Sequence, residues 1–498
     1  MRSFASHLCV ASILALMSLP VCLAQGAGAG GGAAGAGSAG SGAAGAAAGA
    51  GAAGQAGGAA GQAGGAAGQA GAGAQGARGA GAQQPGSGPA SYAAAASAGS
   101  DPRTPPAAKP SALTLQQVVE AARLRNPTLL ALEQNLRAVR AQELQAAVRT
   151  NPYLGLAGSN VTLPADGTNP YAYSVQVSRL FERGNKREYR IENARATTAQ
   201  TEAQLQDTAR QTELAVREAF TTMLIAKQAL QLSRAQVADF RHQVEIGSDR
   251  YQAGDLGKLD YERLDLQLGS FEADEQNALI GVEQASDRLQ TLMGVPVSST
   301  DFDITGPIVP PAVAQSREDI LRTALDRRPD LRAATFAVSA ADAAAKLAIA
   351  QGKADPTLEA EYDKTGHDNS AGFNVNIPLR IFDRNQGNKE TARLQAQAAR
   401  LSEQAVRNGI ASDVNQAWSA YSHARVLSDR FGSHYLDESA DVLSIARFAF
   451  EHGGLALIDY LDALRDARTA TSDALNAYSQ TWIAIHTLSA ATGTELVP

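Results

Sequence analysis

Residues 371–390 decide the fold, and they read AGFNVNIPLRIFDRNQGNKE. In the first half, apolar side chains such as Phe373 and Val375 alternate with polar ones such as Asn374. This period of two predicts a strand with one apolar face and one polar face. Turn-forming residues follow at 383–387, and a run rich in alanine, glutamine and arginine then predicts a helix. The stretch therefore predicts a strand that leads directly into a long helix.

An earlier copy of the same pattern lies at residues 171–188, which read YAYSVQVSRLFERGNKRE. Phe181 and Phe382 lie 201 positions apart, and the two Gly-Asn-Lys triplets lie 203 apart. Four further pairs of landmarks, 199 to 204 positions apart, are Asn126-Pro127 with Arg328-Pro329, Asn151-Pro152 with Asp355-Pro356, Tyr251–Gly254 with Phe450–Gly453, and Asp260-Tyr261 with Asp459-Tyr460. Landmarks kept in order at nearly one spacing indicate an internal duplication. We therefore expect one repeat at 111–300 and a second at 301–498.

Two segments precede the repeats. Residues 1–24 have a basic start, an apolar core and a small-residue cleavage site, which predict a secretory signal peptide. A lipid anchor at Cys22 is the less favoured alternative, because Val21 stands where a small residue is usual. Residues 25–110 are mostly glycine, alanine and glutamine, and they predict a disordered linker because they hold too few large apolar side chains to form a core. The formal net charge of −7 gives no indication of a nucleic-acid partner.

The long helices have the pattern of coiled coils. Residues 186–250 contain one glycine and no proline, and they predict a helix roughly 100 Å long. Apolar and small residues recur every three to four positions over 205–244, and a matching heptad pattern runs over 261–292. The glycine-rich reversal at 254–257 separates the two. Each repeat is therefore expected to end in an antiparallel coiled-coil hairpin.

The predicted strands have the character of strands that cross a bilayer. They alternate apolar with polar residues over about nine to eleven positions, and aromatic residues, scarce elsewhere, gather in them. Four strands cannot close a barrel, and an open sheet edge is not tolerated in lipid. A trimer would supply twelve strands and would gather the long helices into a tube. The alternative is a small water-facing sheet in a secreted structural coiled-coil protein.

The duplicated order of strands and long helical hairpins resembles that of the TolC-type outer-membrane efflux factors, over Leu113–Gly493. Within it, FERGNKR at 181–187 and PLRIFDRNQGN at 378–388 are similar to the branch that exports heavy-metal cations. The resemblance implies an α+β membrane protein. It would form a homotrimer with a twelve-strand β-barrel in the outer membrane of a Gram-negative bacterium and a long coiled-coil helical barrel in the periplasm. The implied partners are outer-membrane lipid, a periplasmic adaptor and a proton-driven inner-membrane pump, and ducts for drugs, small molecules or type I secretion substrates are the alternatives.

The strand-to-helix turns carry the resemblance to the heavy-metal branch. Glycine and asparagine supply the backbone conformations that tight turns need. We expect the functional turn residues to be Phe181, Gly184, Asn185 and Lys186 in the first repeat and Phe382, Arg384, Asn385 and Gly387 in the second.

Aspartates follow the hairpin reversals. By resemblance, Asp459 and Asp462 match an Asp-x-x-Asp pattern at the tunnel entrance of the family, and Asp260 is the partner in the first repeat. Residues three apart share a helical face, and threefold symmetry would place their carboxylates as rings in a pore that attracts cations. The alternative is that these aspartates only favour the dipole at a helix start. The family archetype closes its entrance with a tyrosine and an arginine, where this chain has Phe450 and Leu455, so that closing network is not expected here.

The hairpin tips are the adaptor-docking sites implied by the resemblance. An exposed tip with glycines offers access to the backbone, and its leucines offer an apolar knob. The expected docking residues are Tyr251, Gly254, Leu256, Gly257, Phe450, Gly453 and Leu455.

No enzyme chemistry is indicated. The histidines are scattered without the spacing of metal ligands, and the chain has no phosphate-binding glycine loop, nucleophile elbow or zinc-protease motif. We therefore expect no catalytic residue, no cofactor and no resident metal. The sequence predicts a passive conduit whose energy comes from a partner.

Overall fold

The computed structural model describes residues 101–159 and 171–497, and every structural statement below concerns these ranges. The predicted signal peptide, most of the predicted linker and the reversal between the first two strands lie outside them. The expected linker boundary at 110 is wrong for its last residues. Residues 101–110 pack against the helices, with Pro102 and Pro106 buried.

Each repeat contains two shorter helices, two strands and a long helical hairpin. The first repeat consists of α1 (Leu115–Arg125), α2 (Pro127–Ala147), β1 (Tyr153–Ser159), β2 (Ala172–Leu180), α3 (Lys186–Ala253) and α4 (Lys258–Leu292). The second consists of α5 (Arg317–Arg327), α6 (Pro329–Gln351), β3 (Thr357–Thr365), β4 (Asp368–Asn376), α7 (Gln386–Arg430), the π-helical segment η1 (Phe431–Tyr435), α8 (Leu436–Glu451) and α9 (Leu457–Thr492). The two lists follow the same order, apart from the break at η1.

Backbone geometry identifies the equivalent turns of the two repeats. Asn185 and Asn385 both have φ of 61° and directly precede α3 and α7, so they occupy the same position 200 residues apart. The equivalence of the two Gly-Asn-Lys triplets was therefore wrong, because the second triplet, 387–389, lies inside α7. Asparagine tolerates this left-handed conformation better than most side chains do.

The C-terminal end of the last helix is capped in the same way in both repeats. Gly294 and Gly493 follow α4 and α9, and both have φ of 76°. The side chain of Asn126, at the α1–α2 break, donates from Nδ2 to Leu292 O at 2.9 Å. Arg328, at the α5–α6 break, donates from Nη1 to Ala491 O at 3.4 Å. The last carbonyls of each hairpin are thus capped by the residue that precedes the proline of its own repeat.

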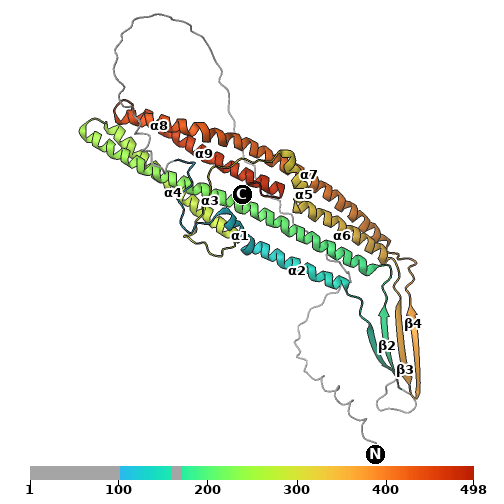
Figure 1. Ribbon diagram of the computed structural model, residues 1–498. Coiled ribbons are helices and arrows are strands. Elements are labelled where there is room, and N and C mark those ends of the chain that lie inside the picture. The colour runs from blue at the N-terminus through green and yellow to red at the C-terminus, as the bar shows by residue number, and fades with distance from the viewer. Residues whose placement is uncertain (1–100, 160–170, 498) are drawn as a thin grey trace, which may run out of the picture. The chain divides into compact units, whose positions relative to one another are not determined.

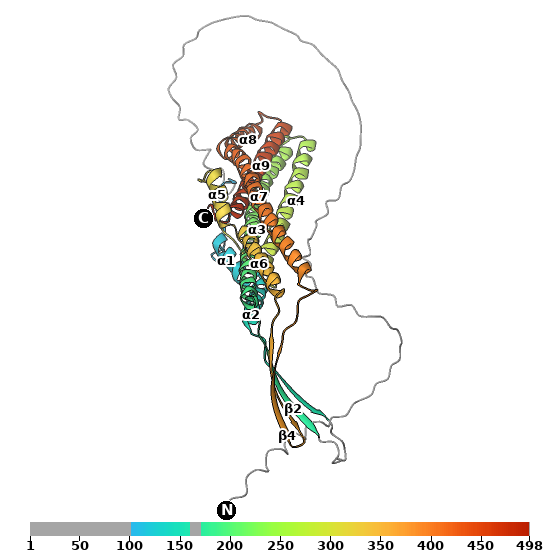
Figure 2. The same cartoon turned by 90° about the vertical axis from the view of Figure 1, so that its right-hand side faces the viewer.

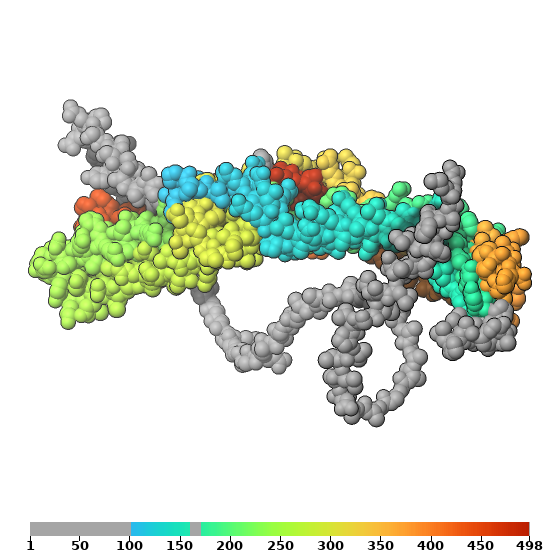
Figure 3. Space-filling view, turned by 90° about the horizontal axis from the view of Figure 1, so that it is seen from below, coloured from blue at the N-terminus to red at the C-terminus, as the bar shows by residue number. Residues whose placement is uncertain are grey.

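The sheet lies at one end of the helices and the two helical reversals lie at the other (Figures 1 and 2). α3 packs along α2, α4 and α6, and α9 packs along α3, α7 and α8. On the face shown in Figure 3, α1 and α2, coloured blue to cyan, lie next to the yellow end of α4. The predicted heptad seam is confirmed where Val216, Met223 and Phe240 of α3 are buried.

The four strands form one antiparallel sheet in the order β1-β2-β3-β4. Within the described chain, β1 and β4 each pair on one side only, so both edges of the sheet are open. β4 ends at Asn376, earlier than the alternation predicted, and Ile377 and Leu379 lie beyond it as exposed residues. An open edge presents unpaired backbone N–H and C=O groups, to which a further strand can pair.

One helical stretch of the described chain, Arg317–Gln351, is long and apolar enough to cross a membrane by length and composition alone. It spans α5 and α6 and is interrupted at Arg328-Pro329. α6 packs between α3 and α7 and buries Leu331, Ala333, Ala343, Ala348 and Ala350.

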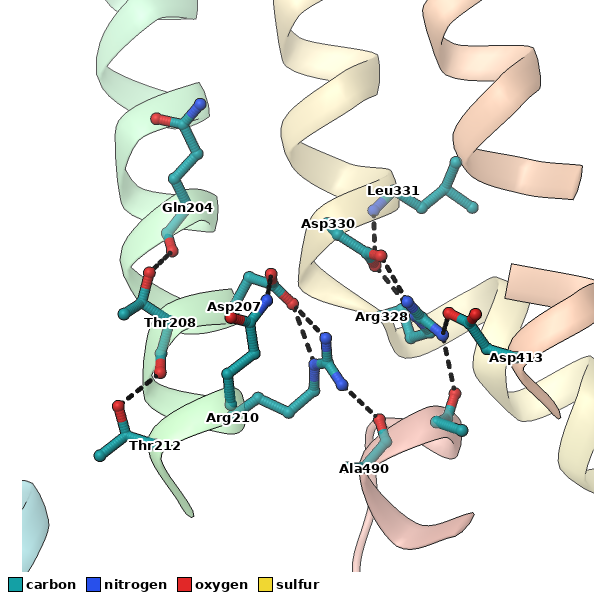
Figure 4. A network of polar contacts seen from close by, with 12 residues as sticks. Gln204, Asp207, Thr208, Arg210, Thr212, Arg328, Asp330, Leu331, Asp413 and Ala490 are labelled. Carbon is teal, nitrogen blue, oxygen red and sulfur yellow. Dashed lines mark hydrogen bonds and ion pairs between the residues drawn. The ribbon is translucent and has the colours of Figure 1, made fainter. Parts of the chain in front are cut away.

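A polar network fixes the helices near the end of α9 (Figure 4). Arg210 of α3 pairs with Asp207 and donates from Nη1 to Ala490 O at 2.7 Å. Arg328 pairs with Asp330 at 2.6 Å and with Asp413 of α7 at 2.9 Å. The Arg328 guanidinium lowers the pKa of the Asp330 carboxyl despite the opposing effect of burial, which raises it. The network therefore joins α3, α6, α7 and α9 through charged groups.

Candidate functional site

Acidic side chains line one face of the sheet. Glu359, Glu361 and Asp363 alternate along β3, so all three lie on the same face. Glu361 lies directly opposite Gln176 of β2 and Gly372 of β4. The other residues on this face are Tyr153, Gly155, Ala157 and Ser159 of β1, Ala172, Ser174, Ser178 and Leu180 of β2, Thr357 and Thr365 of β3, and Asp368, Ser370, Asn374 and Asn376 of β4. Among these paired residues the face holds four carboxylates and no basic side chain.

The opposite face is apolar. Its central residues are Leu154, Leu156, Val175, Val177, Leu358, Ala360, Tyr362, Ala371, Phe373 and Val375. Among the described, paired residues, charged side chains occur on this face only at its two ends, where Arg179 lies opposite Leu358 and Lys364 lies opposite Tyr173. A band of apolar side chains between charged ends is the pattern of a strand surface that faces lipid.

The acidic face was missed in the sequence analysis. The signal was present in residues 357–365, TLEAEYDKT, because carboxylates two positions apart must share a face of a strand. The register of β3 against β2 and β4 shows that no basic group is paired with them on that face.

The first strand-to-helix turn is held by a buried ion pair. Lys186, whose side chain is 6% exposed, contacts Asp355 at 2.6 Å and Lys353 O at 2.8 Å from Nζ. Asp355 also accepts a hydrogen bond from the backbone N–H of Arg183 at 2.8 Å. Gly184 has φ of 78°, and a methyl group there would lie 2.6 Å from the Lys353 side chain. The turn of the first repeat is therefore joined to the loop that precedes β3 in the second.

The second turn is held differently. Asn385 donates from Nδ2 to Ala348 O at 2.8 Å, and the backbone N–H of Arg384 donates to Gln386 Oε1 at 2.9 Å. Phe382 is 90% exposed, whereas Phe181 is half-exposed beneath the Arg179 guanidinium. A side chain at Gly387 would meet open space. A polar pocket of about 390 Å³ lies between the two turns, lined by Glu182, Lys186, Arg190, Leu347, Gln351, Asp355, Arg380 and Asn385.

The two tips present glycines and a tyrosine to solvent. Gly254 and Gly453 end α3 and α8 with φ of 83° and 74°, and a side chain at either would meet open space. Gly257 is exposed, and Tyr251 is partly exposed with its ring stacked on Tyr261. These four residues remain candidates for contact with a partner.

The expected leucine knob and the placement of Phe450 need correction. Leu256 and Leu455 are partly buried against a shared apolar cluster, and Phe450 lies inside it at 3% exposure. The cluster contains side chains from α3, α4, α8 and α9, because four helices meet where both hairpins reverse. Phe450 is therefore a core residue of the tip in this conformation and does not offer its side chain to a partner.

Phe450 is also one of the points at which the two hairpins are joined. Its ring stacks on Tyr460 at 5.0 Å, and Arg250 of α3 lies over it at 5.4 Å. Close by, Gln243 of α3 donates from Nε2 to Glu451 Oε1 at 3.0 Å. Burial raises the pKa of the Tyr460 hydroxyl. This cluster of Arg250, Phe450, Tyr460, Gln243 and Glu451 therefore connects the two hairpins near their tips.

The three predicted aspartates lie near the starts of the helices that follow the tips, with Asp260 and Asp459 in the first turn and Asp462 in the second. Asp260 is in α4, at 3.5 Å from Arg263, and Asp459 and Asp462 are on one face of α9. Asp462 pairs with Arg465 at 2.9 Å, and both side chains are exposed. Asp459 is exposed near the start of α9. The positions of Asp260 and Asp459 fit both the pore ring and the helix-dipole interpretation, whereas Asp462 lies beyond the first turn, where the dipole acts weakly. The pore role of all three stays a prediction.

No group of three or more His, Cys, Asp or Glu in the described ranges is arranged to hold a metal ion. The carboxylates on β3 therefore form an extended charged surface and not a compact chelating site.

A sheet with one acidic and one apolar face, joined to long helical hairpins, is the architecture of a channel-forming membrane protein. The chain belongs to the family of outer membrane efflux proteins, whose model matches residues 118–295 and 320–494, one segment in each repeat. This membership confirms the predicted outer-membrane location and efflux channel function, and a channel of this family is a transport duct and not an enzyme.

Individual relatives agree with this assignment. The chain is 26% identical over 379 residues to the cobalt-zinc-cadmium resistance protein CzcC of Cupriavidus metallidurans, which covers 76% of this chain and 89% of that one. It is 25% identical over 186 residues to the alkaline protease secretion protein AprF of Pseudomonas aeruginosa, covering 34% of this chain and 38% of that one. A crystal structure of CusC, described as forming a transmembrane channel, superposes with a TM-score of 0.64 at 19% identity, covering 76% of this chain and 92% of that one. The last likeness confirms the α+β fold.

Proposed function

We propose that the chain is the outer-membrane duct of a tripartite system that exports heavy-metal cations. The observation that carries the proposal is the sheet face on which the described, paired residues include four carboxylates and no basic side chain. A field of one sign along a narrow passage concentrates counter-ions and excludes ions of like charge. An exit lined in this way favours cations over anions.

The duct requires a homotrimer. The open edges at β1 and β4 would pair between copies, and three copies would close twelve strands with twelve carboxylates facing inward. The hairpins also present apolar residues to solvent on their outer helices. These are Leu259, Leu266 and Ile280 on α4 and Val442, Ile445 and Phe448 on α8. The residues on α4 are spaced by seven and fourteen positions and those on α8 by three, so each set lies along one side of its helix. This arrangement suits contact between α8 of one copy and α4 of the next.

The implied partners are a periplasmic adaptor at the tips and a proton-driven pump in the inner membrane. Support comes from the exposed tip glycines and from the distance between tips and sheet, since α3 spans most of the helical body (Figure 1). The tip aspartates Asp260, Asp459 and Asp462 would add negative charge at the entrance.

Drug efflux and type I secretion are the competing functions. The similarity to AprF covers about a third of the chain, whereas the similarity to CzcC covers about three quarters of it. An acidic lining also gives no advantage to anionic drugs. Metal export is therefore preferred.

The proposal is tested by deleting the gene and restoring it with the wild type or with the triple variant E359Q/E361Q/D363N. Loss of tolerance to zinc, cobalt or cadmium, restored by the wild type and only in part by the variant, is expected. Unchanged metal tolerance together with new sensitivity to drugs would contradict the metal assignment. A band that migrates as a monomer before and after heating would contradict the trimer.

A further inference from the structure

The second long helix has a joint that the first one lacks. α3 runs uninterrupted, whereas η1 separates α7 from α8. At this joint the backbone N–H of Leu436 donates to the carbonyl oxygen of Phe431, five residues earlier. Such a turn interrupts the regular hydrogen-bond ladder, and long helices bend at these interruptions. Beyond the joint, α8 extends to the tip at Phe450.

The backbone of the joint passes close to a side chain of α9. A methyl group on Gly432 would lie 2.9 Å from the hydroxyl oxygen of Tyr478 on α9. Tyr478 is buried, and its hydroxyl has no hydrogen-bond partner among the described residues. That hydroxyl therefore forms no hydrogen bond that would hold the joint, while the Tyr478 ring packs in the same apolar cluster as Leu436 and Phe431.

Arg103 contacts both sides of the joint. Its Nη1 donates to the carbonyl oxygen of Gly432 at 3.2 Å, inside the π-helical segment. Its Nη2 contacts Asp437 Oδ1 at 2.8 Å, in the first turn of α8. Its Nε donates to Asp101 Oδ1 at 3.0 Å, which orients the guanidinium. One side chain thus spans the π turn and the start of the helix that follows.

The segment that carries Arg103 is fastened to α3. Asp101 O accepts a hydrogen bond from Gln228 Nε2 at 3.2 Å, and the backbone N–H of Ala107 donates to Gln231 Oε1 at 2.9 Å. Further along, the backbone N–H of Lys109 donates to Asp303 Oδ2 at 2.7 Å, and Asp303 also forms an ion pair with Lys227 of α3. Residues 101–113, here named the strap, therefore connect α3 to the joint of the other hairpin.

We propose that the strap is a clamp that sets the mobility of α8, with Arg103 as its contact residue. With Arg103 in place, α8 is held to α3 across the joint. Without it, α8 can change its angle to α7, and the tip that it carries moves relative to the first hairpin. The consequence for opening the entrance rests on the proposed channel function, whereas the clamp itself rests only on these contacts.

The clamp is tested by amide hydrogen exchange of the purified full-length protein, comparing wild type with R103A. The expected result is at least about tenfold faster exchange in peptides covering 431–451, with α4 and α2 unchanged. D437N removes one of the contacts at nearly constant volume and should give a smaller increase in the same peptides. R400A is the control, because Arg400 forms an exposed ion pair of equal length, 2.8 Å, with Asp342 away from the joint.

The exchange measurement can contradict the clamp in two ways. Unchanged exchange over 431–451 in R103A contradicts the clamp, and so does a uniform increase along the whole chain, which would assign Arg103 to general stability. Conductance in a planar lipid bilayer separates the two proposals. Faster local exchange with no conductance in any form of the protein would support the clamp and contradict the channel, whereas larger conductance in R103A than in R400A supports both.

Discussion

Arg250 of α3 donates a hydrogen bond from Nη1 to the carbonyl oxygen of Phe450, at 3.1 Å, while its guanidinium lies over the Phe450 ring. The two residues belong to different repeats, 200 positions apart. Their contact joins the two helical hairpins at the end remote from the sheet. Together with the Gln243–Glu451 hydrogen bond and the shared apolar cluster, it is expected to resist separation of the tips.

Arg250→Ala should loosen the tips. The variant loses a charged hydrogen bond and a cation–π contact, which together stabilise the contact by about 1–3 kcal/mol. We expect a higher mean conductance and more frequent openings in planar bilayers, with the fold preserved.

The control for this variant is Arg241→Ala. Arg241 also lies on α3 and pairs with Glu272 of α4 at 2.6 Å, but this pair lies within one hairpin and is exposed. Equal conductance of R250A and wild type would show that the contact does not hold the entrance.

The glycines that close the repeats should not accept a side chain. Gly294→Ala would place a methyl group 2.4 Å from Arg125 O in a backbone of φ 76°, so steric overlap and strain both act. We expect a loss of at least about 2 kcal/mol in the free energy of unfolding. Thermal unfolding followed by circular dichroism measures it.

Gly409→Ala is the matched control. Gly409 lies inside α7, and a methyl group there would meet open space. Alanine in a helix interior should raise stability by about 0.5–1 kcal/mol. If both alanine variants were equally stable, the account of Gly294 as a conformational requirement would fail.

His486 should make the protein sensitive to acid. The ring is 3% exposed and hydrogen-bonds Thr221, and burial, helped by the nearby Arg217 charge, lowers the pKa of His486 to about 4. The unfolded chain therefore binds a proton below pH 6.5 that the folded chain does not bind until about pH 4. The stability should fall by up to about 3 kcal/mol as the pH drops through this window.

Urea unfolding at a series of pH values tests this sensitivity. His486→Gln keeps a polar group near Thr221 and removes the titration, so its stability should vary less than that of the wild type between pH 6.5 and pH 4. Parallel curves for the two proteins would assign the acid sensitivity to other groups.

The Lys186–Asp355 pair should be essential for the junction between sheet and helices. Asp355→Asn leaves a buried ammonium without its counter-charge, which costs about 3–5 kcal/mol. We expect reduced assembly into the outer membrane, measured by fractionation. Lys346→Met is the control, because its ion pair with Glu192 is exposed, and equal losses in both variants would contradict the importance of burial.

Periodicity predicted the elements well because each is a local property of the chain. The alternation of β2, the heptads of α3 and the prolines at the α1–α2 and α5–α6 breaks all appear where the sequence places them. The glycine of each hairpin reversal was also found, since Gly254 and Gly453 both adopt the left-handed backbone that their residue type favours.

The burial of individual side chains and the register between strands could not be predicted from periodicity, because both depend on contacts between distant segments. A phenylalanine at position 450 is compatible with an exposed tip and with a buried core. Phe450 is buried because four helices meet there, and that packing is not visible in the local sequence. The two turns were misaligned because the Gly-Asn-Lys triplet occurs in both repeats. The residue whose backbone conformation matches that of Asn185 is Asn385, which is not part of the second triplet. The acidic face was overlooked because its meaning depends on what pairs with β3 from both sides.

The most direct test of the central claim is the reversal potential of the purified protein in a planar bilayer under a potassium chloride gradient. The account predicts cation selectivity, with a permeability ratio of potassium to chloride on the order of five or more. In E359Q/E361Q/D363N the ratio should fall toward one, and Asp326→Asn, outside the sheet, should leave it unchanged. A channel that prefers anions, or one whose selectivity is the same in the triple variant, would contradict the cation duct.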